Sequence, residues 1–263
     1  MKDMNEDQVR GAVRERYAKI ATLQGGSCCG GGSSCCSVDE MAATSAHLGY
    51  SSAELEAVPA GSNLGLGCGN PQAIAALQPG ETVLDLGSGA GFDCFLAARQ
   101  VGAEGRVIGV DMTPDMLSRA RANAEEGGYA NVDFRLGEIE HLPVADGSVD
   151  VILSNCVINL SPDKGQVFRE AHRVLKPGGR LAISDVVALQ ALPEALRHDL
   201  DAYGGCVAGA AQVGEVEELL RAVGFRDVQV RVKEESRAFI QEWFPGSGAE
   251  AYVASATIEA RRQ

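Results

Sequence analysis

The stretch Val83-Leu-Asp-Leu-Gly-Ser-Gly-Ala-Gly91 places a short apolar run directly before a glycine-rich turn. The run has the length and composition of a buried strand, and the residues that follow Gly91 are typical of a helix. Gly87 and Gly89 permit backbone conformations that other residues rarely adopt, and they let a ligand approach the main chain. The stretch therefore predicts a strand, a tight turn and a helix, arranged as in ligand-binding α/β sheets.

Acidic residues stand at the ends of three successive predicted strands. Asp85 comes two residues before Gly87, where a carboxylate repels a pyrophosphate and attracts an ammonium or a sulfonium. Asp111 ends the second strand, where a carboxylate accepts hydrogen bonds from ribose hydroxyls. Glu138 and Ile139 follow the third strand and place a carboxylate and an apolar side chain beside a base-sized ring. These residues predict a site for a positively charged nucleoside; the alternative is that the glycines only close a turn and the acids cap helices.

From residue 81 onwards, short β-branched or leucine-rich runs alternate with helical ones, which is typical of a parallel sheet with crossover helices. We therefore predict an α/β fold with a Rossmann-like, mostly parallel central sheet and flanking helices. The predicted strands are residues 82–86, 106–110, 132–136, 149–154 and 180–184, and the predicted helices are 91–101, 114–126 and 161–175.

The two ends of the chain differ from this core. Apolar residues at helical spacing predict a helix over 7–23, and a glycine- and cysteine-rich loop (25–37), a short helix (51–57) and a glycine-rich turn (61–71) follow it. After residue 187 the sequence predicts helices over 193–203 and 214–223 and strands over 228–232 and 252–259. This tail either completes the same sheet or forms a small separate lobe.

The composition excludes several classes of protein. Among 263 residues, 23 are basic and 36 are acidic, which gives a net charge of −13 and makes nucleic acid an improbable partner. With 45% hydrophobic and 22% charged residues, the chain has the composition of an ordinary soluble protein. No apolar run reaches the roughly 20 residues of a membrane helix, and the N-terminus is charged where a signal peptide is apolar. We therefore expect a cytoplasmic protein with no membrane partner.

The chain contains eight cysteines, which is unusual for a protein too long to need disulfide staples. Cys156 follows the fourth predicted strand, at the edge where open α/β sheets bind ligands. Cys68 and Cys206 lie in glycine-rich segments on either side of the core, in positions to fold over that edge. Three thiolates brought together by the tertiary fold suit a soft, trigonal-pyramidal centre such as As(III). The alternative is that each is a small buried hydrophobic residue, which is our interpretation of Cys94.

The glycine loop and the three acids resemble the class I S-adenosylmethionine-dependent methyltransferases, from Val83 to about Ser184. By this resemblance Asp85, Gly87 and Gly89 lie near the methionine part of the cofactor, the second strand end lies near ribose and adenine, the third lies near adenine, and Asn155 faces the methyl group. The cofactor-binding residues that the resemblance implies are Asp85, Gly87, Ser88, Gly89, Asp111, Met112, Gly137, Glu138, Ile139 and Asn155.

The cysteine-containing motifs are more specific. Gly65-Leu-Gly-Cys-Gly-Asn70 and Ser154-Asn-Cys-Val-Ile-Asn-Leu-Ser161 resemble the arsenite methyltransferases, and the resemblance extends over most of the chain. It implies methyl transfer from S-adenosylmethionine to As(III), with Cys68, Cys156 and Cys206 as catalytic arsenic ligands and methylated arsenicals as detoxification products. It also divides the chain into an N-terminal helical and cysteine-rich segment (1–62), an S-adenosylmethionine-binding core (63–187) and a C-terminal arsenic-binding and capping region (188–263).

The resembling family has a further functional cysteine nearer the N-terminus, which pairs with the thiol matched here by Cys68. In this chain the candidates for that redox relay are Cys28, Cys29, Cys35 and Cys36; the alternative is that the segment is a solvated loop. Methyl transfer to the arsenic lone pair needs no general base, but it oxidises arsenic, so we expect a thiol reductant, thioredoxin or glutathione, as co-substrate. Two other functions remain open here, namely a small-molecule C- or O-methyltransferase and a non-catalytic As(III)- or Sb(III)-binding protein.

Overall fold

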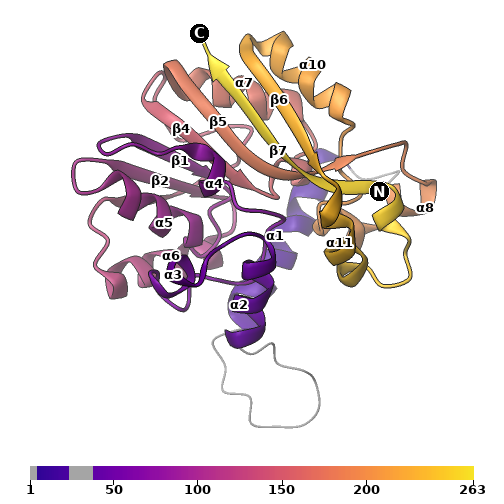
Figure 1. The fold of residues 1–263 in the computed structure, drawn as a ribbon, viewed down its shortest axis with the longest axis horizontal. Helices are drawn as coiled ribbons and strands as arrows, with labels where there is room; N and C mark the ends of the chain where they lie inside the picture. Colours follow the sequence, from indigo (N-terminus) through magenta and orange to yellow (C-terminus); the bar gives the residue numbers. More distant parts are fainter. Residues whose placement is uncertain (1–4, 24–37) are drawn as a thin grey trace.

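The computed structural model describes residues 5–23 and 38–263, arranged around one seven-stranded sheet (Figure 1). The strand order is β3-β2-β1-β4-β5-β7-β6. The first five strands pair in parallel, and β7 pairs antiparallel with both of its neighbours. The strands are β1 (Thr82–Leu86), β2 (Arg106–Asp111), β3 (Val132–Leu136), β4 (Val149–Asn155), β5 (Leu175–Ala188), β6 (Phe225–Lys233) and β7 (Val253–Arg262).

The five predicted core strands are confirmed, and the tail completes the same sheet. β5 extends beyond its predicted bounds at both ends, because Leu175 pairs with β4 across a bulge and Ala188 pairs with β7. The side chains of β7 are buried from Val253 to Ile258, as expected of a strand that lies inside a sheet. The strands are added to one side of β1 up to β3 and to its other side from β4 onwards, so the strand order reverses between β1 and β4. The carboxyl ends of these two strands form the switch point at which open α/β sheets bind ligands.

Helices cover both faces of the sheet (Figure 1). One apolar core lies beneath α4 (Gln72–Ala75), α5 (Phe92–Val101) and α6 (Pro114–Gly127), and another lies beneath α7 (Lys164–Val174) and α10 (Val213–Val223). α7 begins three residues later than predicted, because the Asp163 carboxylate caps it by accepting a hydrogen bond from the Gln166 amide at 2.8 Å. The predicted helix over 193–203 is instead two short helices, α8 (Glu194–Arg197) and α9 (Leu200–Gly204), since Asp199 caps the second one.

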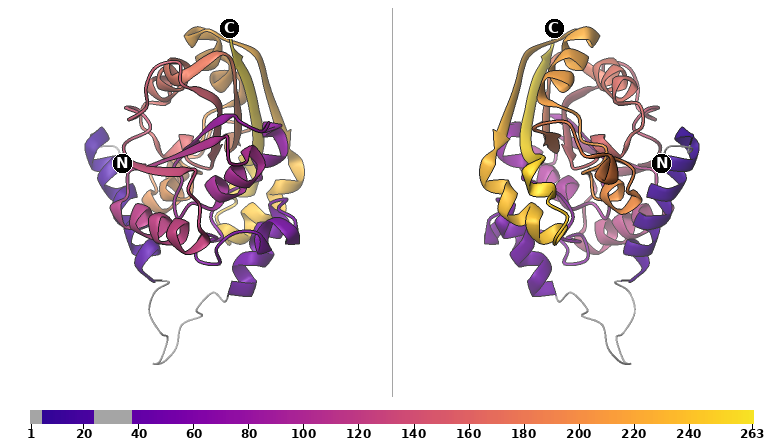
Figure 2. Two further views of the ribbon diagram at one scale, coloured as in Figure 1. Left: turned by 90° about the vertical axis from the view of Figure 1, so that its left-hand side faces the viewer. Right: turned by 90° about the vertical axis from the view of Figure 1, so that its right-hand side faces the viewer.

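The N-terminal helices lie at the carboxyl edge of the parallel strands. Figure 2 shows α1 (Glu6–Leu23) and α2 (Val38–His47) on opposite sides of the molecule. α1 and α3 (Ser52–Glu56) confirm the helices predicted in this part of the chain, whereas α2, α4 and α11 (Arg237–Trp243) have no predicted counterpart. Three short 3-10 helices complete the described structure: η1 (Ile158–Leu160), η2 (Glu234–Ser236) and η3 (Ala249–Ala251). Within the described ranges, no helix combines the length and the apolar character that a membrane crossing would require.

Candidate active site

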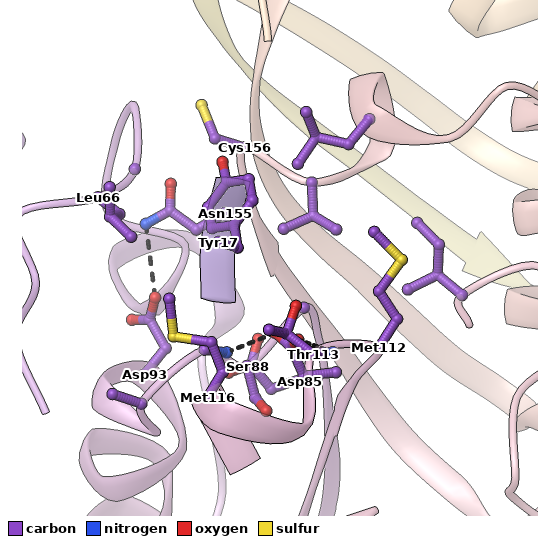
Figure 3. A pocket seen from close by; sticks show the side chains of 18 of the residues that line it. Tyr17, Leu66, Asp85, Ser88, Asp93, Met112, Thr113, Met116, Asn155 and Cys156 are labelled. Atoms are coloured by element: carbon purple, nitrogen blue, oxygen red, sulfur yellow. Dashed lines mark hydrogen bonds between the residues drawn. The ribbon is translucent and has the colours of Figure 1, made fainter. Parts of the chain in front are cut away.

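A cavity opens at the switch point, where the ends of β1 and β4 meet α1 and the loop before α4. Figure 3 shows Asp85, Ser88 and Thr113 at one end of the cavity and Asn155 and Cys156 at the other. The cavity therefore joins the two parts of the predicted site. Nine of the ten predicted cofactor residues line it: Asp85, Gly87, Ser88, Gly89, Asp111, Met112, Gly137, Ile139 and Asn155.

The glycine turn has the geometry of a ligand cradle. Gly87 and Gly89 have φ of +68° and +52°, which favour glycine, and a Cβ at Gly87 would lie 2.4 Å from a methyl group of Val157. A Cβ at Gly89 would meet nothing within 4 Å, so the main chain there faces open space. The Gly89 amide donates to Asp111 at 2.9 Å, which holds that carboxylate at the end of β2. The Ser88 hydroxyl lines the cavity and is buried without a hydrogen-bond partner, as expected of a group that a ligand completes.

The cavity also contains carboxylates without cationic partners. Asp85 is buried, and its hydrogen-bond partner is the Cys94 thiol, whose sulfur lies 3.2 Å from Oδ2. Burial and the nearby Asp93 carboxylate raise the pKa of Asp85 well above its usual value. Among the described residues, neither Asp85 nor Asp93 forms an ion pair. A cationic ligand would lower the free energy of both charges, so this end of the cavity fits the sulfonium and ammonium of S-adenosylmethionine.

Glu138 departs from the prediction. Its carboxylate does not line the cavity but pairs with Arg14 of α1 at 3.1 Å and lies 3.8 Å from Arg10. The neighbouring acid Glu140 lines the cavity instead, where it is buried and accepts hydrogen bonds from Arg10 at 3.2 Å and from Ser161 at 2.7 Å. Glu140 was not predicted to be in the site, because the motif after β3 does not reveal that α1 lies across it.

The fold brings the three predicted arsenic ligands together. Cys68 and Cys156 form a disulfide, with Cα atoms 5.8 Å apart, and the Cys206 thiol donates to the carbonyl of Cys156 at 2.7 Å. All three cysteines are buried, but only Cys156 lines the cavity. Cys156 and Cys206 have φ of +57° and +64°, which is a strained conformation for residues other than glycine. Such strain is concentrated at functional sites, and these two cysteines are among only four non-glycine residues that show it in the described structure.

The other cysteines differ in their surroundings. Cys94 is buried in α5, as predicted, but its thiol also contacts Asp85, which the sequence analysis did not anticipate. The four candidates for a redox relay, Cys28, Cys29, Cys35 and Cys36, lie outside the described residues. The disulfide that the structure contains joins Cys68 to Cys156 rather than to a cysteine nearer the N-terminus.

Asn155 holds the main chain of the Cys68 loop. Its side-chain oxygen accepts a hydrogen bond from the Cys68 amide at 3.0 Å, and its nitrogen donates to the Gly69 carbonyl at 2.8 Å. The same nitrogen lies 3.4 Å from Asp93 (Figure 3). Ser255 of β7 donates to the Cys68 carbonyl at 2.8 Å. The sequence offered no signal for Ser255, because 187 residues separate it from Cys68.

Asp185 anchors the segment that follows Cys156. It is buried and accepts hydrogen bonds from the Ile158 amide and from Asn159, both at 2.9 Å. One of its carboxylate oxygens lies within 4.8 Å of the sulfurs of Cys68 and Cys156. Burial raises the pKa of Asp185 to about 6. Asp185 was not among the residues predicted for the site, because no local motif marks its proximity to Cys68.

We expect the stability of the ligand-free protein to depend on Asp93. Burial raises its pKa from 3.8 to about 6, although hydrogen bonds from Tyr50, Gln72 and Asn155 oppose the shift. A raised folded-state pKa stabilises the protein below pH 3.8, and that stabilisation is lost as the pH rises to about 6. As the pH rises through this window, the free energy of unfolding of wild type should therefore fall by up to about 3 kcal/mol relative to that of Asp93→Asn. Urea unfolding of both proteins at several pH values measures the difference, and parallel pH profiles would contradict the prediction.

The chain is similar to known methyltransferases. A family model described as a methyltransferase domain matches residues 77–224. The arsenite methyltransferase of Halobacterium salinarum is 53% identical over 267 residues, which cover 99% of this chain and 68% of that protein. The arsenite methyltransferase of Aquipseudomonas alcaligenes is 54% identical over 168 residues, which cover 61% of this chain and 48% of that protein. The chain thus spans about two thirds of the length of the first relative and about half of the second.

A solved structure shares both the fold and part of the sequence. The crystal structure of an arsenic(III) S-adenosylmethionine methyltransferase from Chlamydomonas reinhardtii superimposes with a TM-score of 0.60 at 35% identity. The match covers 83% of this chain and 72% of the algal one.

Proposed function

The chain belongs to the arsenite methyltransferase family of S-adenosylmethionine-dependent methyltransferases, and from this premise we propose how its cleft methylates As(III). Three cysteines converge beside the cofactor cavity, and one of them, Cys156, also lines it. This convergence is the observation that carries the proposal. A C- or O-methyltransferase of the same fold has no use for three converging cysteines, and a non-catalytic arsenic-binding protein has no use for the glycine cradle.

The cofactor supplies an electrophilic methyl group on a sulfonium. The Asp85 carboxylate faces the end of the cavity that would receive the positive charges, and Gly89 lets the main chain approach without a side chain between. Asp111, held by the amides of Gly89 and Thr113, presents its carboxylate to the ribose hydroxyls. Gly137 and Ile139 provide an apolar wall for the adenine. These residues orient the methyl group toward Cys156 at the other end of the cavity.

The cysteines hold the substrate. Each thiol replaces one hydroxide of arsenite: a sulfur–arsenic bond forms, an arsenic–oxygen bond breaks, and the thiol proton leaves with the hydroxide as water. Three such exchanges release three waters and leave As(III) with its lone pair opposite Cys68, Cys156 and Cys206. Burial raises the pKa of the Cys206 thiol, so it keeps the proton that this exchange consumes. With S-adenosylmethionine bound, the lone pair would attack the methyl carbon in line: an arsenic–carbon bond would form, the carbon–sulfur bond would break, and S-adenosylhomocysteine would leave with that electron pair. The residues of the cleft would accelerate this step by positioning the two reactants.

A thiol reductant is part of the proposal. The disulfide between Cys68 and Cys156 leaves two of the three ligands unable to bind arsenic. Two thiols of thioredoxin or glutathione would reduce it to two cysteine thiols and leave the reductant as a disulfide. Because each methylation oxidises arsenic, the same reductant is needed again before the next transfer.

The proposal predicts methylated arsenic from three components. Reduced protein, arsenite and S-adenosylmethionine should yield methylated arsenicals and one S-adenosylhomocysteine per methyl group, as measured by chromatography with mass-spectrometric detection. Protein that carries the disulfide should be inactive until thioredoxin or glutathione is added. If the reduced protein binds the cofactor but forms no methylated arsenic, the proposal is wrong.

We further propose that at least one of Cys28, Cys29, Cys35 and Cys36 relays electrons to Cys68. Replacing all four by serine should leave a single turnover of the reduced protein intact and should slow the later turnovers, because only these require re-reduction. Single-turnover and multiple-turnover rates measured on one preparation separate the two effects. Equal multiple-turnover rates in the variant and in wild type would contradict the proposed relay.

A further inference from the structure

α1 presents one face to the cavity. Arg10, Val13 and Tyr17 all line it, and their spacing of three and four residues places them on the same side of the helix. Val13 is 3% exposed, so the helix is packed closely against the cavity wall. A ligand in the cavity therefore contacts α1 directly.

One part of α1 is attached to the cofactor end of the site. Arg10 donates to Glu140 at 3.2 Å, and Arg14 donates to Glu138 at 3.1 Å. Both acids belong to the segment after β3 that contributes Gly137 and Ile139 to the cavity wall. These charged contacts fix α1 relative to the expected adenine pocket.

The following turn of α1 is attached to the arsenic end. The Tyr17 hydroxyl donates to the carbonyl of Gly204 at 3.3 Å, and Arg16 pairs with Asp201 at 2.9 Å. The stem of Arg16 packs so closely on Gly204 that a Cβ there would lie 2.6 Å from the Arg16 Cδ. Gly204 comes two residues before Cys206, whose backbone is left-handed and whose amide donates to the carbonyl of Tyr203 at 2.9 Å.

We propose that α1 couples the two parts of the site, with Tyr17 as the positioning residue for Cys206. The inference rests on the proposed function. A cofactor in the cavity contacts the side chains of Val13 and Tyr17 only while α1 lies against the cavity, so the bound cofactor stabilises this position of the helix. The same position holds Gly204, and through it the backbone of Cys206, in the conformation that completes the three-thiol set. By linkage, arsenite then raises the affinity for the cofactor by the same factor.

The test measures arsenite binding with and without S-adenosylhomocysteine, which occupies the cofactor cavity without turnover. In reduced wild-type protein, saturating S-adenosylhomocysteine should tighten arsenite binding by about fivefold or more. In Tyr17→Phe the ring remains but the bond to Gly204 is lost, so this factor should fall to within about twofold of one. S-adenosylhomocysteine affinity in the absence of arsenite is measured on the same variant, so that the factor compares arsenite binding to cofactor-free and to cofactor-saturated protein.

Tyr129→Phe is the matched control. Its hydroxyl also donates to a backbone carbonyl at 3.3 Å, that of Ala57, but Tyr129 does not line the cavity. This variant should keep the full coupling factor. A coupling factor of one in wild type, or an unchanged factor in Tyr17→Phe, would overturn the inference.

A second measurement is independent of arsenic. S-adenosylhomocysteine should slow the alkylation of Cys206 in wild type and in Tyr129→Phe, because a fixed Cys206 segment opens less often, and it should not do so in Tyr17→Phe. Equal protection in all three proteins would contradict the coupling. Failure of wild type to bind arsenite while Cys206 is still protected would instead remove the proposed function and leave the coupling in place.

Discussion

Cys156→Ser should lower the rate of arsenite methylation by on the order of 100-fold or more, since loss of even the partners of metal ligands costs about 10–100-fold. Serine has nearly the same shape, but its hard oxygen is a poor ligand for As(III). Cys156 is the one cysteine of the three that lines the cofactor cavity, so in the proposed mechanism it holds the arsenic closest to the methyl group. Steady-state rates with excess thiol measure the effect, because excess thiol removes any contribution from the lost disulfide.

The cofactor site provides the internal control for this substitution. Asn155 and the glycine turn keep their contacts in Cys156→Ser, so S-adenosylmethionine should bind with an affinity within about twofold of wild type. Cys206→Ser should lower the rate similarly, since both residues are arsenic ligands in the proposal. Full methylation activity in Cys156→Ser with thiol present would show that the cysteine is a buried structural residue.

Asp85→Asn should weaken S-adenosylmethionine binding by about 2–5 kcal/mol, the usual cost of removing one member of a buried charge pair. The ligand-free protein should become more stable by about 1–3 kcal/mol at neutral pH, because a buried carboxylate without a cationic partner is replaced by a neutral amide. The gain should vanish at low pH: the raised pKa keeps Asp85 protonated there in the folded state, so wild type has no buried charge to remove. Calorimetric binding and urea unfolding measure the two opposite effects.

Asp133→Asn is the matched control for the second prediction. Asp133 lies on β3, outside the cavity, and pairs with Arg106 at 3.0 Å and Arg135 at 2.8 Å, which lowers its pKa. This substitution should leave cofactor affinity unchanged and should destabilise the protein by no more than about 1 kcal/mol, as expected of an exposed ion pair. If Asp85→Asn bound the cofactor as tightly as Asp133→Asn does, the assignment of Asp85 would be wrong.

Local patterns accounted for most of the core. The bounds of β1 and β3 agree with the prediction to the residue, because each is a short apolar run between turn residues, and these signals are local. Helix ends were less predictable. The start of α7 and the break between α8 and α9 depend on whether Asp163 and Asp199 accept bonds from the following amides, and aspartate forms such caps only in some contexts.

Contacts between distant segments explain the differences within the site. Glu138 and Glu140 are equivalent acids in the sequence, but α1, more than 120 residues earlier, contacts them differently. Glu138 pairs with Arg14 outside the cavity, whereas Glu140 lines the cavity wall. The same helix adds Tyr17 to the site, whereas its apolar spacing predicted only a packed face.

By itself, the sequence determined the α/β core, the glycine cradle and most of the residues that line the cavity, because these depend on the conformational and chemical properties of neighbouring residues. The resemblance of the sequence to a family also indicated which three of the eight cysteines are candidate arsenic ligands. Only the tertiary structure decided that the tail completes the sheet, that Cys68 pairs with Cys156, and that α1 connects both ends of the cavity. These contacts join residues 65 or more positions apart, as Ala188 and Val253 are, and their free energy depends on the packing of the whole chain and leaves no local pattern.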